Sequence, residues 1–169
     1  VTLRPKFAGS LLLTRPSDTG LEILMGRRSA AHAFMPKRYV FPGGRVDRAD
    51  HFAPIAGDLN PACLSIMSRS IPESKARAIA VAAVRETAEE TGMVIGARGR
   101  ISSRHPTWDC FRRIGAKPDL SGLQLITRAI TPPGRVRRFD AWFFRADIQT
   151  VIGEEAAFEA NELEDLRWV

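Results

Sequence analysis

Three glutamates close together in the sequence have the type and spacing of a metal-binding cluster. Glu86, Glu89 and Glu90 lie in the stretch Ala78–Met93, AIAVAAVRETAEETGM, whose Ala-rich composition predicts a helix that ends at Gly92. At about 100° per residue, the three carboxylates share an arc roughly 100° wide. They repel one another, and the helix dipole disfavours negative charge in the last turns. A hard divalent cation would offset this repulsion through oxygen ligands, and a solvated acidic helix end is the alternative explanation.

The residues around these glutamates resemble a known signature. Arg85-Glu86-x-x-Glu89-Glu90-x-Gly92-Met93 matches the second half of the Nudix box, Arg-Glu-U-x-Glu-Glu-x-Gly-U, in which U is an aliphatic residue or Thr. The chain thus resembles the Nudix hydrolases, which cleave nucleoside diphosphates linked to another moiety. The resemblance implies that Glu86, Glu89 and Glu90 bind Mg²⁺ or Mn²⁺ and that one of them helps to activate water. It also implies that Arg85 pairs with a carboxylate of the box and has a positional role.

The first half of the box lies upstream. A strand predicted at Arg38–Phe41 runs into a Gly-Gly pair, for which a tight turn is the simpler explanation. In the family the box begins Gly-x5-Glu. Here Gly44 is followed by five residues and then Asp50, so Asp50 takes the Glu position, and the resemblance implies a weak or water-mediated metal ligand. Gly43 matches a family position whose backbone carbonyl often binds metal.

An insertion separates the two halves of the box. Thirty-four residues lie between Asp50 and Arg85, where the family pattern has seven. The excess falls within about residues 51–75, which are rich in Pro and include a short apolar patch. We expect an inserted loop with one short helical turn, packed beside the site. Pro72 then suits the first turn of the catalytic helix.

The Phe-Pro-Gly-Gly sequence, the Asp in place of Glu and the long insertion together resemble one branch of the family. That branch contains the peroxisomal coenzyme A diphosphatases and their bacterial relatives. Two further stretches are similar to it: Ala33–Pro36 before the box, and Ile130–Gly134 followed by Arg137–Phe144 after it. The resemblance therefore spans about Ala33–Ala146. It implies a coenzyme A-type substrate, with ADP-ribose or another nucleotide sugar as the next candidates.

Two groups of arginines are candidates for contact with substrate phosphates. Arg135, Arg137 and Arg138 cluster between two predicted strands, where they form either the charged rim of a hairpin or a site for the 3′-phosphate of a coenzyme A-type molecule. Arg27 and Arg28 close another predicted strand and are either solvated or in contact with phosphate. The sequence leaves both pairs of alternatives open.

The pattern of strands and helices predicts one α/β domain over residues 1–169, a Nudix-type α/β/α sandwich with a mixed sheet between helices. The predicted strands are 7–14, 21–28, 38–41, 93–95, 123–131, 138–146 and 166–169, and a short helix is predicted at 107–114. The aromatic residues Trp142, Phe143 and Phe144 are assigned to the core.

Both ends of the chain carry further expectations. Val1 is not an initiator Met, and related domains usually continue into another helix, so we expect missing residues at the N-terminus and a truncated C-terminus. The acidic stretch before the last strand is expected to be a loop or a weak helix. In the family an additional metal-binding carboxylate often comes from a later loop, and the candidates here are Glu154, Glu155 and Glu159.

Composition limits the class of protein. Of the 169 residues, 44% are hydrophobic and 26% are charged, as in ordinary soluble domains, and no apolar run approaches the roughly 20 residues of a membrane span. Cys63 and Cys110 match no metal-binding spacing and are expected to be reduced thiols in a cytoplasmic protein. The net charge of +6 is scattered, without aromatic–basic interleaving, so we expect neither a nucleic acid nor a membrane as partner.

The expected partner is therefore a small nucleoside diphosphate derivative, since a basic surface around an acidic metal site suits a polyphosphate. A homodimer is left open. The expected activity is metal-dependent hydrolysis of the diphosphate linkage, and the alternative is a regulatory domain that binds a nucleotide without hydrolysing it. Such a regulator would typically lack one carboxylate of the triplet, and this chain has all three.

Overall fold

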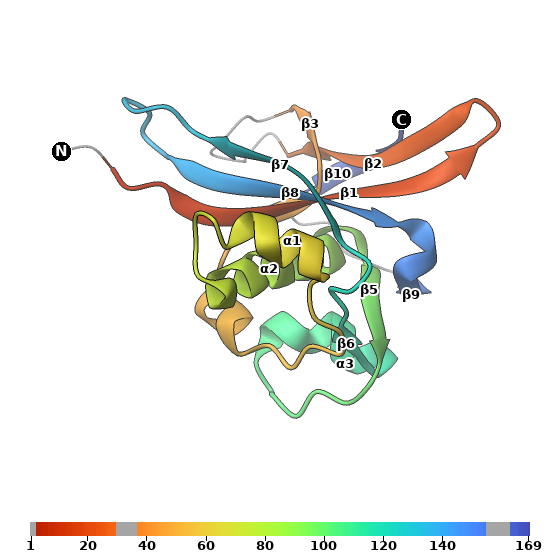
Figure 1. The fold of residues 1–169 in the computed structure, drawn as a ribbon. Coiled ribbons are helices and arrows are strands. Elements are labelled where there is room, and N and C mark those ends of the chain that lie inside the picture. Colours follow the sequence, from red (N-terminus) through yellow and green to blue (C-terminus); the bar gives the residue numbers. More distant parts are fainter. Residues whose placement is uncertain (1–2, 30–36, 155–162) are drawn as a thin grey trace.

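A seven-stranded mixed sheet forms one layer of the molecule (Figure 1). The structure, a computed structural model, describes residues 3–29, 37–154 and 163–169. Across the sheet run β10 (Leu163–Trp168), β2 (Gly20–Arg28), β1 (Lys6–Ser17), β8 (Phe139–Asp147) and β7 (Gln124–Ile130). Two short strands complete it: β3 (Tyr39–Val40) pairs with β2, and β4 (Gly43–Arg45) pairs with β1. β1 and β8 are parallel and the other pairs are antiparallel, which confirms the predicted mixed sheet.

Helix α2 (Glu73–Thr91) packs on β1 and is buried along most of its length. Gly9 of β1 allows close contact, because a Cβ atom there would lie 2.2 Å from the carbonyl oxygen of Ile79. Pro72 is the N-cap residue, one position before the first helical residue, and Gly92 ends the helix in the left-handed conformation with φ of 74°. The predicted helix and its stop at Gly92 are confirmed.

A second sheet has three strands. It contains β6 (Ala116–Pro118), β5 (Met93–Arg98) and β9 (Val151–Glu154), of which only β5 was predicted, over its first half. The remaining helical elements are α1 (Pro61–Met67), α3 (Asp109–Ile114) and the 3₁₀ turns η1 (Arg48–Phe52), η2 (Pro106–Trp108) and η3 (Ile148–Thr150). In Figure 1, α1, α2 and α3 lie on the same side of the large sheet. Among the described residues, no helix is both long enough and apolar enough to cross a membrane.

The insertion is part of the core, so the expectation of an accessory loop beside the site is wrong. Asn60 caps α1 by accepting a hydrogen bond from the Cys63 N–H (3.0 Å), and its Nδ2 donates to the carbonyl of Leu123 (2.6 Å). Its buried apolar side chains are Leu59, Cys63, Met67 and Ile71. These residues join the same hydrophobic cluster as α2, and none of them lines the cavity described below.

Candidate active site

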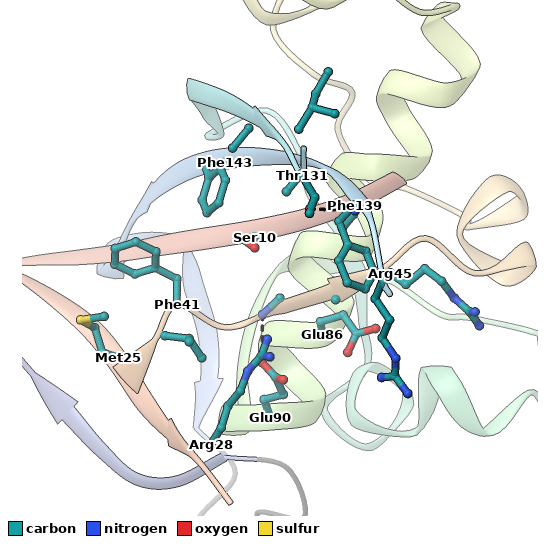
Figure 2. Close-up of a pocket in the computed structure, with 18 of the residues that line it drawn as sticks. Ser10, Met25, Arg28, Phe41, Arg45, Glu86, Glu90, Thr131, Phe139 and Phe143 are labelled. Atoms are coloured by element: carbon teal, nitrogen blue, oxygen red, sulfur yellow. Dashed lines mark hydrogen bonds between the residues drawn. The ribbon is translucent and has the colours of Figure 1, made fainter. Parts of the chain in front are cut away.

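A cavity of about 1050 Å³ opens on the face of the large sheet that points away from α2. Ala8 and Ser10 of β1 line it, whereas Gly9, between them, faces α2, as the alternation of side chains along a strand requires. At one side of the cavity, Glu86 and Glu90 of α2 reach past β4 and line it as well (Figure 2). The sheet face and the acidic helix therefore contribute to one site.

Arg85 connects the acidic residues. Its Nη1 donates to Glu86 Oε1 (2.8 Å) and Glu89 Oε2 (2.9 Å), and its Nε donates to Asp50 Oδ1 (2.8 Å). Its Nη2 donates to Asp50 Oδ2 (3.1 Å) and to the carbonyl of Arg45 (3.2 Å). Burial alone would lower the pKa of Arg85, but the hydrogen bonds with Asp50 and the charges of its three acidic partners outweigh burial and raise it. The guanidinium thus remains charged and offsets the repulsion within the triplet.

Asp50 faces Arg85 and is fully buried, with its side chain 0% exposed. One of its oxygens also accepts a hydrogen bond from the Asp47 N–H (2.7 Å), which closes a capping box at the start of η1. Both carboxylate oxygens are therefore engaged within the protein. In this geometry Asp50 positions Arg85, and the weak metal contact expected from its place in the box has no support.

The glycine pair allows the close approach of β4 to the helix. Gly43 has φ of 152°, and a Cβ there would lie 2.5 Å from the carbonyl oxygen of Gly9. Its N–H donates to Glu90 Oε2 (2.9 Å). A Cβ at Gly44 would lie 2.4 Å from the carboxyl carbon of Glu86. Each glycine therefore contacts a different carboxylate of the triplet.

The three glutamates differ in their surroundings. Glu90 is buried, the Glu86 side chain is 17% exposed and the Glu89 side chain is 35% exposed. Glu86 and Glu90 line the cavity, and Glu89 does not. Among the described residues, no three acidic, His or Cys side chains converge as a set of metal ligands. Arg85 Nη1 lies between Glu86 and Glu89 and bonds both of them.

The arginine candidates divide between the cavity and the rest of the surface. Arg135 and Arg137 line the cavity, whereas Arg138 donates to the carbonyls of Thr131 (3.0 Å) and Leu3 (2.6 Å) and is not part of the lining. Arg28 also lines the cavity. Its neighbour Arg27 lies 3.8 Å from Glu164 of β10, with its side chain 44% exposed.

Aromatic and apolar side chains form much of the cavity wall. Phe143 was assigned to the core together with Trp142 and Phe144, but only the latter two are buried on the α2 side. Phe143 points the other way and meets Phe41 edge to face, with ring centroids 6.5 Å apart (Figure 2). Strict alternation along β8 could have separated Phe143 from its neighbours.

Some predicted features lie outside the described residues. These are Ala33–Pro36, Glu155, Glu159 and the side chain of Glu154, whose backbone ends β9. Arg45 was not predicted as a site residue, although it directly follows the glycine pair. Its place beside Gly44 is the signal that could have identified it.

Comparison with known proteins gives one curated relative and several solved structures. The acyl-coenzyme A diphosphatase NUDT19 of Gallus gallus is 29% identical over an alignment of 197 positions, which covers 80% of this chain and 51% of the relative. The chain thus spans about half the length of that protein. No family model matches the chain.

The solved structures establish the fold. A Nudix hydrolase from Alicyclobacillus acidocaldarius superposes with a TM-score of 0.71 at 24% identity, covering 98% of this chain and 78% of that one. A MutT Nudix hydrolase from Burkholderia pseudomallei superposes with a TM-score of 0.52 at 17% identity, covering 98% of this chain and 83% of that one. The Nudix domain of Shewanella oneidensis NrtR, complexed with ADP ribose, superposes with a TM-score of 0.50 at 12% identity, covering 98% of this chain and 73% of that one. The chain therefore has the α/β/α fold of the Nudix hydrolases, in which the described helices α1, α2 and α3 form the layer on one side of the large sheet. In sequence it resembles that family and an acyl-coenzyme A diphosphatase.

Proposed function

We propose that this protein is a metal-dependent Nudix pyrophosphohydrolase that cleaves the diphosphate linkage of a nucleoside diphosphate derivative. The observation that carries the proposal is the position of Glu86 and Glu90, which line the same cavity as Arg28, Arg45 and the sheet face. A cavity of about 1050 Å³ is large enough for a dinucleotide-sized ligand.

The donor set has the chemistry that Mg²⁺ or Mn²⁺ requires. It consists of carboxylate oxygens and a backbone carbonyl, which are hard ligands. We propose that Glu86, Glu89 and Glu90 and the carbonyl of Gly43 hold the ion. Glu86 and Glu89 would then exchange Arg85 Nη1 for the cation, and Asp50 would keep the guanidinium beside them through its two hydrogen bonds.

The chemistry is displacement at phosphorus by water. A divalent cation, when bound, neutralises charge on the phosphate oxygens and lowers the pKa of water. One carboxylate of the triplet accepts a proton from the attacking water, whose oxygen forms a new bond to phosphorus as the bridging P–O bond breaks. Arg85 acts as a positioning residue, because its Nη1 holds Glu86 and Glu89 beside the cavity until the cation takes its place.

A coenzyme A-type molecule is the proposed substrate, with ADP-ribose or a nucleotide sugar next. Two observations support it: the curated relative is an acyl-coenzyme A diphosphatase, and Arg135 and Arg137 line the cavity and can meet a 3′-phosphate. Cleavage would leave 3′,5′-ADP and 4′-phosphopantetheine.

The two buried free cysteines are compatible with a reducing compartment, and we place the protein in the cytoplasm.

Competitive kinetics tests the substrate. With Mg²⁺ present, coenzyme A should exceed dephospho-coenzyme A and ADP-ribose by at least about tenfold in kcat/KM, or roughly 1.4 kcal/mol in transition-state binding. Arg137→Ala should reduce the ratio of kcat/KM for coenzyme A to kcat/KM for dephospho-coenzyme A. Arg138→Ala, outside the cavity, is the matched control. Equal kcat/KM for all three would refute a coenzyme A preference.

The alternative function is a nucleotide-binding regulator. The similar structure of an NrtR Nudix domain complexed with ADP ribose is the observation that keeps it open. Binding of ADP-ribose without phosphate-bond cleavage, under conditions in which Mg²⁺ or Mn²⁺ is saturating, would favour this function over hydrolysis.

A further inference from the structure

Two arginines lie on opposite sides of the carboxylates that line the cavity. In Figure 2, Arg28 reaches from β2 toward Glu90, and Arg45 lies on the side of Glu86. We propose that Arg28 and Arg45 bind the two phosphates of the diphosphate from either side, independently of the group attached to them. The inference rests on the proposed function and adds two substrate-contacting residues to it.

The position of Arg28 follows from the strand that carries it. Adjacent residues on a strand point to opposite faces, so Arg28 shares the face of the buried Leu24 and reaches the cavity from the end of β2. Arg27 is directed to Glu164, and Arg28 is directed into the cavity. The backbone N–H of Arg28 donates to the carbonyl of Arg38 (3.0 Å), which fixes the base of its side chain at the end of β2.

Arg45 is held next to the other carboxylate. It follows Gly44, whose α-carbon abuts Glu86, and its carbonyl accepts a hydrogen bond from Arg85 Nη2 (3.2 Å). Pairing of Arg45 with Ala8 fixes β4 on the sheet. The side chain therefore starts at a defined place beside Glu86. Arg48, three residues later in η1, is exposed and does not line the cavity.

The charges at the site favour two such groups. Glu86 and Glu90 carry negative charge at the place where a diphosphate must approach, and Arg85 is already engaged by three carboxylates. A guanidinium can bind a phosphate through two parallel hydrogen bonds, which a Lys ammonium cannot reproduce. Arg28 and Arg45 bring this geometry from two different strands to the two sides of the site.

Besides Arg85, four of the described arginines line the cavity, and they have separate roles. Arg135 and Arg137 follow β7 in an exposed turn and are suited to an outlying phosphate. Arg28 and Arg45 lie at the carboxylates and are suited to the diphosphate that every candidate substrate contains. Substitution of Arg28 or Arg45 should therefore lower kcat/KM by a similar factor for coenzyme A, dephospho-coenzyme A and ADP-ribose.

The direct test is calorimetric binding of α,β-methylene ADP, a non-hydrolysable diphosphate, with Mg²⁺ present. Arg28→Gln and Arg45→Gln should each weaken binding by at least about tenfold, or roughly 1.4 kcal/mol. Arg28→Lys should recover only part of the loss. The controls Arg27→Gln and Arg48→Gln should bind within about twofold of the wild type, since exposed arginines outside the cavity make no phosphate contact. Melting temperatures establish that each variant is folded.

The outcomes separate the two proposals. Wild-type binding that is lost in both Gln variants supports the inference, even where no substrate is cleaved and the proposed hydrolysis fails. Hydrolysis by the wild type, with binding and kcat/KM of both Gln variants equal to those of the controls, overturns the inference and leaves the hydrolase assignment intact. Failure of wild-type binding overturns it as well.

Discussion

Replacing Asp50 by Asn removes the negative charge from the most deeply buried partner of Arg85. The Asp50 side chain is 0% exposed and that of Arg85 is 5% exposed. Breaking a buried ion pair from one side typically costs about 3–5 kcal/mol, because the other charge stays buried. Arg85 keeps its bonds to Glu86 and Glu89, so we expect the lower limit, about 3 kcal/mol. In a domain of this size that corresponds to a melting temperature lower by about 6–12 °C.

Asp58→Asn provides a matched control. Asp58 also forms a two-point pair with Arg77, from Nε (2.8 and 2.9 Å) and Nη2 (2.8 Å), but the side chains are 43% and 33% exposed. An exposed pair contributes at most about 1 kcal/mol. The hydrogen bond from Arg77 lowers the pKa of Asp58, so this contribution is present above the unfolded pKa, near about 4, and is lost as pH falls through the folded value. Both variants are therefore measured at pH 7.

Urea unfolding at pH 7 measures the two losses, and isothermal titration with Mg²⁺ measures the effect on the metal. A loss for Asp50→Asn no larger than that for Asp58→Asn would refute the claim that Asp50 anchors Arg85. If Asp50→Asn instead kept its stability and lost Mg²⁺ affinity, Asp50 would be a metal ligand, as its place in the box suggested.

The other predictions concern the carboxylates, the glycines and the insertion. Glu89→Gln or Glu90→Gln should lower kcat by at least about a hundredfold in a folded protein. A kcat near the wild-type value in both variants would refute a catalytic role for these two glutamates. Mg²⁺ at about a hundred times its Kd should stabilise the fold by about 2.7 kcal/mol in a thermal melt, and Glu86→Gln/Glu90→Gln should lose most of that shift. Gly43→Ala should cost about 1–3 kcal/mol of stability, because it strains φ and meets the backbone of Gly9, whereas Gly44→Ala should displace the Glu86 carboxylate and reduce Mg²⁺ affinity in a stable fold. Replacing residues 52–70 by a Gly-Ser link should abolish cooperative unfolding, because it deletes Leu59, Cys63 and Met67 from the core; a stable shortened protein would contradict this placement.

The sequence predicted the parts of the molecule that follow local rules. Helix α2 was identified by its composition and by Gly92, whose left-handed conformation ends it. The long strands β1, β2, β7 and β8 were recognised by their apolar patterns, because such patterns repeat at short range. The strands β6 and β9 have three and four residues, too few for a periodic signal.

Long-range partners could not be predicted in the same way. The insertion has the Pro-rich composition of a surface loop, yet the Asn60 side chain bonds the carbonyl of Leu123, 63 residues away, and places α1 in the core. The role of Asp50 depended on its distance from Arg85, which spacing in the sequence does not determine. Likewise, alternation along the strand separates Arg27 from Arg28, but the pairing of β10 with β2 places Glu164 beside Arg27.

The insertion and the Asp in place of Glu both leave the acidic site intact, because Asp50 still pairs with Arg85. Lengthening a closed loop from about seven to thirty-four residues adds about 1.4 kcal/mol of closure entropy, because that cost grows only with the logarithm of length. The two ends of the insertion remain joined by Arg85 and Asp50, with Nε and Oδ1 2.8 Å apart. Asp is one methylene shorter than Glu, and the capping box of η1 brings its backbone close enough for both oxygens to reach Arg85. Asp50 therefore still holds Arg85 beside the carboxylates of α2, although the insertion separates the two halves of the box in the sequence.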